Sequence, residues 1–282
     1  MPGEAFYATL DDGPLGRRYA VWHAPGAVPK GLIVQVPPFA EEMNKSRRMT
    51  ALAAQAMVSA GWAVLRLDLL GCGDSDGDLS DASWSAWLDD IGHACRIADE
   101  RAAAFWPHAA GLPRILWGHR AGSLLAAHAA ATWPAWGQRL VLWQPQPAGR
   151  QVMQQFIRLR IAAAMQGDDA KLVGEQLRAD LAAGRTVDAA GYRLPAALAA
   201  SFETTALEPP PQAGQALWFE LQAREGASLL PATAAARDRW AGAGWAVDAQ
   251  VLQGPAFWMT VEVEESAALV DATVAALDRW RT

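Results

Sequence analysis

The stretch that decides the fold reads RILWGHRAGSLLAA and runs from Arg114 to Ala127. An apolar run ends in the segment GHRAG, residues 118–122, and passes directly into a segment rich in alanine and leucine. This order predicts a buried strand, a sharp turn and a helix, which is the setting of a nucleophile elbow. The central position of such a turn ordinarily carries serine, because the strained turn lifts that side chain clear of the sheet. Arg120 stands there instead, and a guanidinium that stays protonated cannot act as an ordinary nucleophile.

The composition of the whole chain narrows the class of protein. A length of 282 residues with 52% hydrophobic residues suits one α/β domain that carries an insertion. The net charge of −6 and the lack of long lysine and arginine runs argue against nucleic acid as the main partner, because neutralising phosphates needs a basic face. A local site for an anion stays compatible with this charge.

The cysteines and the hydropathy of the chain bear on its location. The first ten residues lack a basic segment followed by an apolar one, and no stretch reaches about 18 uninterrupted apolar residues. The two cysteines, Cys72 and Cys95, show no spacing typical of a zinc site or of a disulfide framework. The sequence therefore predicts a cytoplasmic protein with no membrane span, no metal and no other cofactor.

Apolar runs alternate with segments of helical composition along most of the chain. This alternation predicts right-handed crossovers and a mostly parallel central sheet with helices on both faces. Together with the elbow it indicates an α/β-hydrolase fold. Strands are expected over residues 18–22, 31–36, 62–68, 114–117, 139–144, 216–221 and 245–252. Helices are expected over residues 49–60, from Ser80 or Asp81 onward, after the elbow, over 232–240 and over 266–281.

The segment 148–211 differs from the rest of the chain, because it is helical in composition and ends in three prolines. A helical insertion at this point is where α/β hydrolases carry a lid, and lids shape pockets and exclude water. We therefore assign residues 1–147 and 212–282 to the hydrolase core and residues 148–211 to a helical lid. The alternative is that these helices simply cover the sheet.

A hydrolase of this fold places its catalytic groups in the order nucleophile, acid, histidine. The loop after the strand that ends at Leu221 holds one carboxylate, Glu225. The loop after the last strand, residues 253–260, should hold the histidine, yet the last histidine of the sequence is His128. With Arg120 at the elbow, all three roles of the triad are weakened together.

The segment PPFAEEMNKSRRM, residues 37–49, follows a strand where one N–H of an oxyanion hole is ordinarily found. It is expected to be a charged loop up to residue 49, facing Arg120 across the cleft. Glu41 or Glu42 is then a base that activates water, and Arg120 holds an anionic group or a developing oxyanion. His119, next to the elbow tip, is a further candidate base, so the catalytic candidates are Glu42, Arg120 and His119. The alternative is an ion pair of Arg120 with Glu42 that plugs an inactive site.

The glycine-rich segment LLGCGDSDG, residues 69–77, also follows a predicted strand. A dinucleotide-binding fingerprint would need glycine where Asp76 stands, so we do not expect a nucleotide cofactor. Cys72 is a spare nucleophile on this turn, but a thiol needs an electropositive neighbour to ionise. We favour a small residue that is tolerated in a glycine turn.

Four motifs together resemble a known family: residues 37–47, DLLGCGDS at 68–75, GHRAG at 118–122 and GPAFW at 254–258. They resemble the type 2 hydrolases associated with the exosortase A system, over nearly the whole chain. The resemblance implies an α/β-hydrolase fold in the setting of bacterial exopolysaccharide production and PEP-CTERM protein sorting. It also implies a companion type 1 hydrolase and an acyl carrier protein as partners. The binding candidates from these motifs are Phe39, Glu41, Asn44, Arg47, Cys72, Phe257 and Trp258.

Two functions follow from these observations. The first is an enzyme that hydrolyses or transfers an acyl group, with a carrier-bound or saccharide-linked ester or thioester as its small-molecule substrate. The second is a pseudoenzyme that keeps the pocket without turnover and serves as a ligand-binding or partner subunit. An open pocket with Arg120 and Glu42 unpaired favours the first. A filled cleft beside an exposed apolar patch favours partnership.

Overall fold

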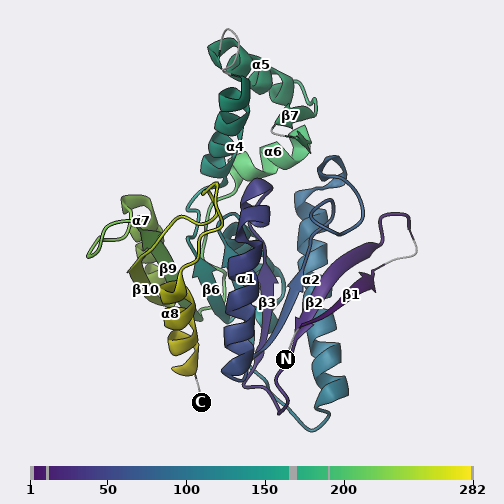
Figure 1. Ribbon diagram of the computed structural model, residues 1–282, viewed down its shortest axis with the longest axis vertical. Helices are drawn as coiled ribbons and strands as arrows, with labels where there is room; N and C mark the ends of the chain where they lie inside the picture. The colour runs from purple at the N-terminus through teal and green to yellow at the C-terminus, as the bar shows by residue number, and fades with distance from the viewer. Residues whose placement is uncertain (1–2, 11–12, 165–169, 190, 281–282) are drawn as a thin grey trace.

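The computed structural model describes residues 3–10, 13–164, 170–189 and 191–280. Its centre is an eight-stranded sheet in the order β1-β2-β4-β3-β5-β6-β9-β10 (Figure 1). The first two strands run antiparallel, and the six from β4 to β10 run parallel to one another. The predicted α/β-hydrolase architecture is confirmed. The strands span β1 Glu4–Thr9, β2 Arg17–His23, β3 Leu32–Val36, β4 Ala63–Leu67, β5 Arg114–His119, β6 Arg139–Trp143, β9 Gln215–Gln222 and β10 Ala246–Gln253.

Helices cover both faces of this sheet. On one face the odd-numbered side chains of β5, Ile115 and Trp117, join a core with the apolar sides of α1 (Glu41–Ser59) and α8 (Ala267–Asp278). On the other face Leu116 joins a core with α2 (Trp84–Phe105), α3 (Gly122–Thr132) and α7 (Pro231–Gly242). Side chains of a strand point alternately to its two faces, so a wholly apolar strand is buried on both. The site therefore stands on a rigid three-layer base.

Two helices begin elsewhere than predicted. Helix α1 starts at Glu41 and not at Met49, so the charged residues expected in a loop form its first two turns. Acidic residues in a first helical turn are stabilised by the helix dipole, which accounts for this start. Helix α2 starts at Trp84, because the Ser83 hydroxyl accepts the Ala86 N–H at 3.1 Å.

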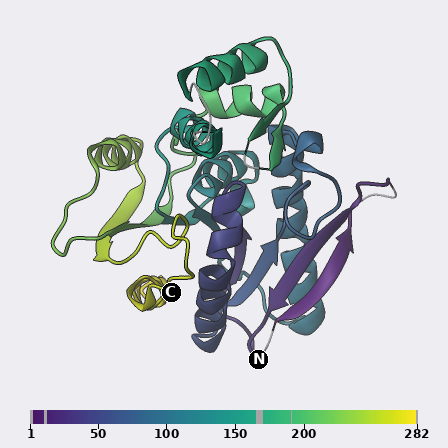
Figure 2. The same cartoon turned by 45° about the horizontal axis from the view of Figure 1, so that its top comes forward.

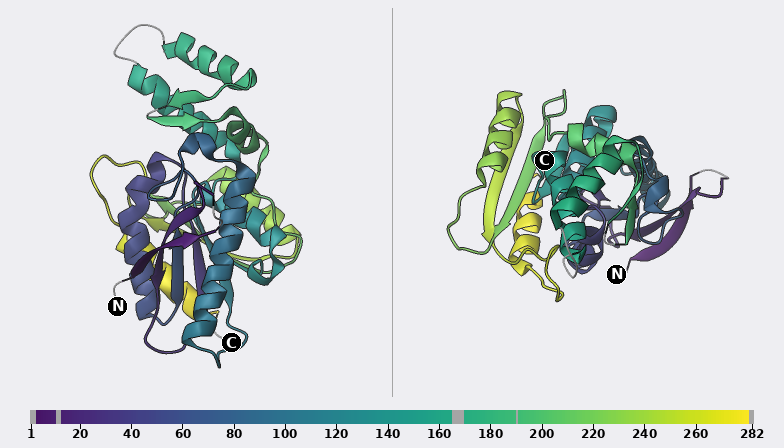
Figure 3. Two further views of the ribbon diagram at one scale, coloured as in Figure 1. Left: turned by 90° about the vertical axis from the view of Figure 1, so that its right-hand side faces the viewer. Right: turned by 90° about the horizontal axis from the view of Figure 1, so that it is seen from above.

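The chain leaves the sheet between β6 and β9. It forms α4 (Gly149–Ala164), α5 (Ala170–Ala182), a small hairpin of β7 (Val187–Ala189) and β8 (Tyr192–Leu194), and α6 (Ala196–Thr204). These elements lie together beyond one end of the strands (Figure 2), and the side view in Figure 3 shows that α5 lies farthest from the sheet. We call residues 148–211 the inserted segment. Its hairpin was not predicted, and its role as a lid stays a prediction.

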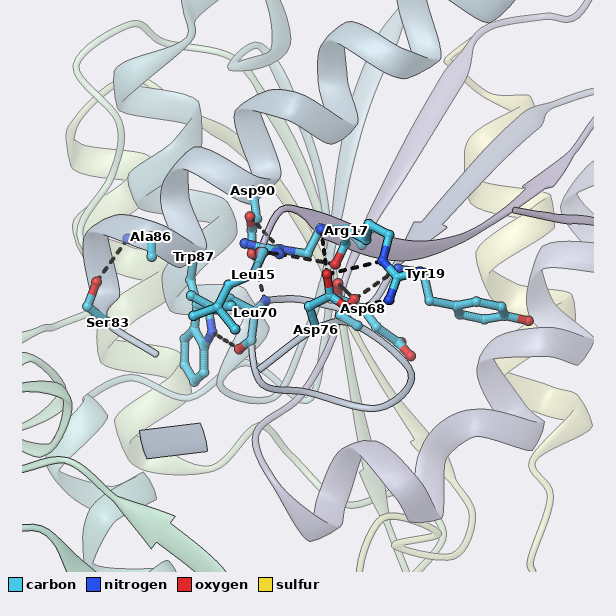
Figure 4. A network of polar contacts seen from close by, with 12 residues as sticks. Leu15, Arg17, Tyr19, Asp68, Leu70, Asp76, Ser83, Ala86, Trp87 and Asp90 are labelled. Carbon is cyan, nitrogen blue, oxygen red and sulfur yellow. Dashed lines mark hydrogen bonds and ion pairs between the residues drawn. The ribbon is translucent and has the colours of Figure 1, made fainter. Parts of the chain in front are cut away.

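A buried polar network anchors the glycine-rich loop after β4 (Figure 4). The Arg18 Nε donates to Asp90 Oδ1 at 2.9 Å, and the other carboxylate oxygen accepts the Leu70 N–H at 2.7 Å. The Trp87 indole N–H donates to the Leu70 carbonyl at 3.0 Å. The side chains of Arg18 and Asp90 are both almost wholly buried. The loop is therefore held by α2 on one side and by β2 on the other.

Among the described residues, no helix combines the length and the apolar character needed to cross a bilayer. Within the same part of the chain, no cluster of three or more histidine, cysteine, aspartate or glutamate residues is placed to hold a metal ion.

Candidate functional site

The turn between β5 and α3 has the geometry of an elbow. Arg120 adopts φ = 55°, a left-handed conformation that is unfavourable for a residue with a long side chain. A Cβ atom at Gly122 would lie 2.3 Å from the Val36 carbonyl oxygen and 2.5 Å from that of Pro37, so only glycine fits there. The glycine spacing of the sequence thus corresponds to a real steric need. The tip side chain is presented at the carboxyl ends of the parallel strands.

The Arg120 guanidinium is paired at this tip. Its Nη2 donates to Glu42 Oε1 at 2.6 Å and its Nε lies 3.2 Å from each oxygen of that carboxylate. The same Nη2 donates to Gln155 Oε1 of α4 at 2.8 Å, and the guanidinium carbon lies 5.1 Å from the centre of the Trp258 ring. Such a forked, charge-assisted arrangement fixes both partners. Arg120 therefore ties the elbow to α1 and to the inserted segment at once.

A cavity of about 820 Å³ opens directly above this pair. Its wall includes the predicted site residues Phe39, Glu41, Glu42, Arg120 and Trp258. Further wall residues come from the corner after β6, from α4 and from the start of α7. The cleft is thus open while Arg120 and Glu42 are paired, a combination that neither sequence-based alternative described. This volume is in the range of small-molecule binding sites.

His119 lies beneath the tip, away from the cavity wall. It is 1% exposed, and its ring packs against Trp143, Phe257 and Trp258 at centroid distances of 5.9, 5.3 and 5.7 Å. Neither ring nitrogen has a hydrogen-bond partner among the described residues. Burial lowers the pKa of His119 well below its usual range, and the nearby Arg120 charge lowers it further. This neutral, enclosed ring does not favour the base role predicted for His119.

Glu41 and Asn44 meet the inserted segment at one tyrosine. The Asn44 amide donates to the Tyr192 hydroxyl at 2.9 Å, and that hydroxyl donates to Glu41 Oε2 at 3.2 Å. Burial, followed by the Glu41 charge, raises the pKa of Tyr192 to about 12, so the phenol stays protonated. Nearby, the Phe39 ring lies 5.1 Å from the ring of Phe156 in α4. The first turn of α1 thus fastens the inserted segment to the core. Sequence reasoning missed Tyr192, which lies far along the chain.

Arg47 and Cys72 lie outside the cavity. Arg47 Nη2 donates to Asp68 Oδ2 at 2.8 Å, and the same oxygen accepts the Asp74 N–H at 3.1 Å. This pair fastens α1 to the glycine-rich loop. Burial, followed by the charges of Asp68 and Asp90, raises the pKa of the Cys72 thiol to about 12. A thiol with such a pKa is protonated at neutral pH and does not favour a nucleophilic role.

The rate of alkylation shows whether the Cys72 thiol is ionised. In the folded protein at pH 8, iodoacetamide should modify Cys72 about a thousandfold more slowly than a cysteine of ordinary pKa, because only the thiolate reacts. Peptide mass spectrometry at timed intervals gives the rate, and protein unfolded in urea provides the control. Modification of native Cys72 at the rate seen in the unfolded chain would show that its thiol is ionised.

A family model described as serine aminopeptidase, S33, matches residues 27–173, which is just over half of the chain. The chain belongs to this α/β-hydrolase family. Comparison with curated protein sequences gives no match.

Solved structures of several hydrolases share the fold of this chain, although their sequence identity to it is low. A thermostable carboxyl esterase from Bacillus coagulans, in complex with glycerol, superposes with a TM-score of 0.64 at 16% identity, covering 100% of both chains. Est1E from Butyrivibrio proteoclasticus with bound ferulic acid gives 0.61 at 16% identity, covering 98% of this chain and 99% of the other. A serine hydrolase without a lid from Xanthomonas campestris gives 0.57 at 18% identity, over 100% and 96%.

The two loops expected to hold the acid and the histidine of a triad place neither group in the cavity. Glu225 is exposed on the loop between β9 and α7 and does not line the cavity. A second carboxylate, Glu220, is buried in β9, where its Oε1 accepts the Leu230 N–H at 2.9 Å and the Gln222 amide at 2.7 Å. Sequence reasoning missed Glu220, although a lone acid inside an apolar strand was a visible signal. Phe257 and Trp258 stand on the loop after β10, where a histidine was expected, and Phe257 is buried and does not line the cavity.

Proposed function

We propose that the elbow cleft binds a small ligand with an acyl part and does not form an acyl-enzyme at the elbow. The protein is then a pseudoenzyme of its hydrolase family, with a binding pocket in place of a catalytic one. The observation that carries this proposal is the Arg120–Glu42 pair at the floor of an open cavity of about 820 Å³. The tip side chain cannot attack a carbonyl, yet the space for a substrate is kept.

The geometry leaves Arg120 with one way to engage a ligand. Its Nε and Nη2 are taken by Glu42 and Gln155, while its Nη1 has no hydrogen-bond partner among the residues that the structure describes. An N–H of this kind suits a carbonyl or carboxylate oxygen. The guanidinium can therefore hold the head of an acyl group without transferring a proton.

Hydrolysis by activated water is the second candidate function. Glu42 lines the cavity, and a carboxylate at that place could take a proton from water. Both of its oxygens, however, already accept hydrogen bonds from Arg120, so taking a proton from water would require this pair to loosen. We therefore rank binding above hydrolysis.

The resemblance to the type 2 hydrolases of the exosortase A system supports a biological setting. The ligand would come from exopolysaccharide production or PEP-CTERM protein sorting, presented free, on an acyl carrier protein or by a companion type 1 hydrolase. Exposed apolar side chains on the loop between β10 and α8, Met259, Val261 and Val263, offer a surface for such a partner.

A ligand screen with product detection tests this proposal. Acyl esters, acyl-pantetheine thioesters and sugar phosphates are incubated with the protein, and mass spectrometry follows both binding and products. We expect at least one acyl compound to bind and to be recovered unchanged. Arg120→Ala should weaken its binding about tenfold, the effect of losing one charge-assisted hydrogen bond.

Two further variants separate binding from catalysis. Arg120→Ser should not create an esterase, because no histidine stands on the loop after β10 to act as its base. Circular dichroism confirms that each variant is folded. Product formation by the natural protein that is lost in Glu42→Gln would establish the hydrolytic alternative.

A further inference from the structure

Glutamine is the most frequent polar residue in the lining of the cavity. Five glutamines line it, two from the corner that follows β6 and three from α4: Gln144, Gln146, Gln151, Gln154 and Gln155. We call this set the amide wall. Each carboxamide offers two N–H donors and one acceptor oxygen, and none of them carries a charge.

Gln146 is the least exposed member of the amide wall. It is 8% exposed and lines the cavity, and its carboxamide has no hydrogen bond to any residue that the structure describes. Its side-chain oxygen and nitrogen reach the open cavity, where both are available to a ligand.

Gln144, at the corner after β6, is held by an unusual backbone conformation and by a hydrogen bond from β9. Its φ of 44° is left-handed, and its Oε1 accepts the Leu221 N–H at 2.8 Å. That bond anchors the side chain to β9 and leaves its NH₂ group as a donor. Gln155 is anchored through its Oε1 to Arg120. Two amides of the wall are thus held in place by the core itself.

The remaining lining combines the charged residues Glu41, Glu42, Lys45, Arg120 and Arg158 with apolar side chains such as Phe39, Val152, Phe156, Leu221 and Trp258. These apolar side chains suit the hydrocarbon tail of an acyl group. The charge of Arg120 is balanced by Glu42 at the floor, and Glu41, Lys45 and Arg158 also line the cavity. Hydroxyl groups, which both donate and accept, match carboxamides better than a carboxylate does, because a carboxylate only accepts.

We infer that the amide wall recognises the hydroxyl-bearing part of an acylated polyol, the chemistry of a sugar ester, with Gln146 as its central contact. The acyl tail then lies against the apolar side chains, and the ester carbonyl faces Arg120 Nη1. This inference rests on the proposed function, since it assumes that the cleft binds a ligand.

Three probes with an eight-carbon tail and different heads test the inference. These are octyl β-glucoside below its micelle concentration, sodium octanoate and S-octanoyl pantetheine, each titrated by calorimetry into the full-length protein. We expect the glucoside to bind at least about tenfold more tightly than octanoate, since its hydroxyls pair with the amides. Gln146→Leu should weaken glucoside binding about tenfold and leave octanoate binding unchanged.

Matched variants guard against a folding defect. Gln212→Leu makes the same change at an exposed glutamine outside the cavity and should leave all three affinities unchanged. Gln151→Leu changes an exposed member of the amide wall and should weaken only the glucoside, even where Gln146→Leu does not fold.

The outcomes separate the two proposals. If octanoate or the pantetheine thioester binds as tightly as the glucoside and the glutamine variants change nothing, the polyol inference is wrong while the proposed binding function stands. If none of the three probes binds, both are contradicted.

Discussion

Asp90→Ala is expected to lower the free energy of unfolding by about 3–5 kcal/mol, the effect of breaking a buried ion pair from one side. The variant leaves Arg18 as a buried, uncompensated charge and removes the acceptor of the Leu70 N–H. Burial raises the pKa of Asp90 even though Arg18 donates to it, so the intact pair is itself strained by desolvation. Urea unfolding followed by tryptophan fluorescence measures the change.

The neighbouring Asp89 provides the control for that measurement. Asp89 lies on the same helix but is exposed, so Asp89→Ala should change the stability by less than about 0.5 kcal/mol. Equal stabilities of the two variants would show that the network after β4 does not anchor the loop.

Arg120→Ala should lower the free energy of unfolding by about 2–3 kcal/mol. The pair with Glu42 is nearly buried on the arginine side and partly open to the cavity on the carboxylate side, so the loss is smaller than for Asp90. The variant also removes the hydrogen bond to Gln155 that ties α4 to the elbow. Urea unfolding again gives the value, and a double-mutant cycle with Glu42→Gln isolates the coupling between the two side chains.

An exposed ion pair that also involves α1 is the matched control. Arg48 and Glu265 form a pair in which both side chains are largely solvent-exposed, and Arg48→Ala should change the stability by less than about 1 kcal/mol. If Arg120→Ala is no more destabilising than Arg48→Ala, the elbow pair is not a structural tie.

The sequence predicted the elbow turn because its glycines meet a local steric demand. Gly122 faces two backbone carbonyls, and a strand followed at once by a helix leaves few other conformations. The same local reasoning found Arg120 at the tip and Glu42 opposite it. The start of α1 was missed, because a charged segment after two prolines is also typical of a loop, although Glu41 and Glu42 suit the first turn of a helix.

The rest of the site depends on contacts between distant parts of the chain. Tyr192 meets Glu41 only because the inserted segment folds back over α1. Gln146 stands between two prolines just after the predicted strand 139–144, and nothing local shows that α4 will enclose a cavity around it. His119 was predicted as a base from its place beside the tip, but side chains of a strand alternate, and its ring is directed into the core.

A crystal structure of the protein soaked with an octanoyl sugar ester is the most direct test of the central claim. We expect the intact ester in the cavity, with its carbonyl oxygen at Arg120 and the Arg120–Glu42 pair preserved. An acyl group bonded to any side chain of the cleft, a cleaved ester, or a cavity that stays empty at saturating ester would contradict it.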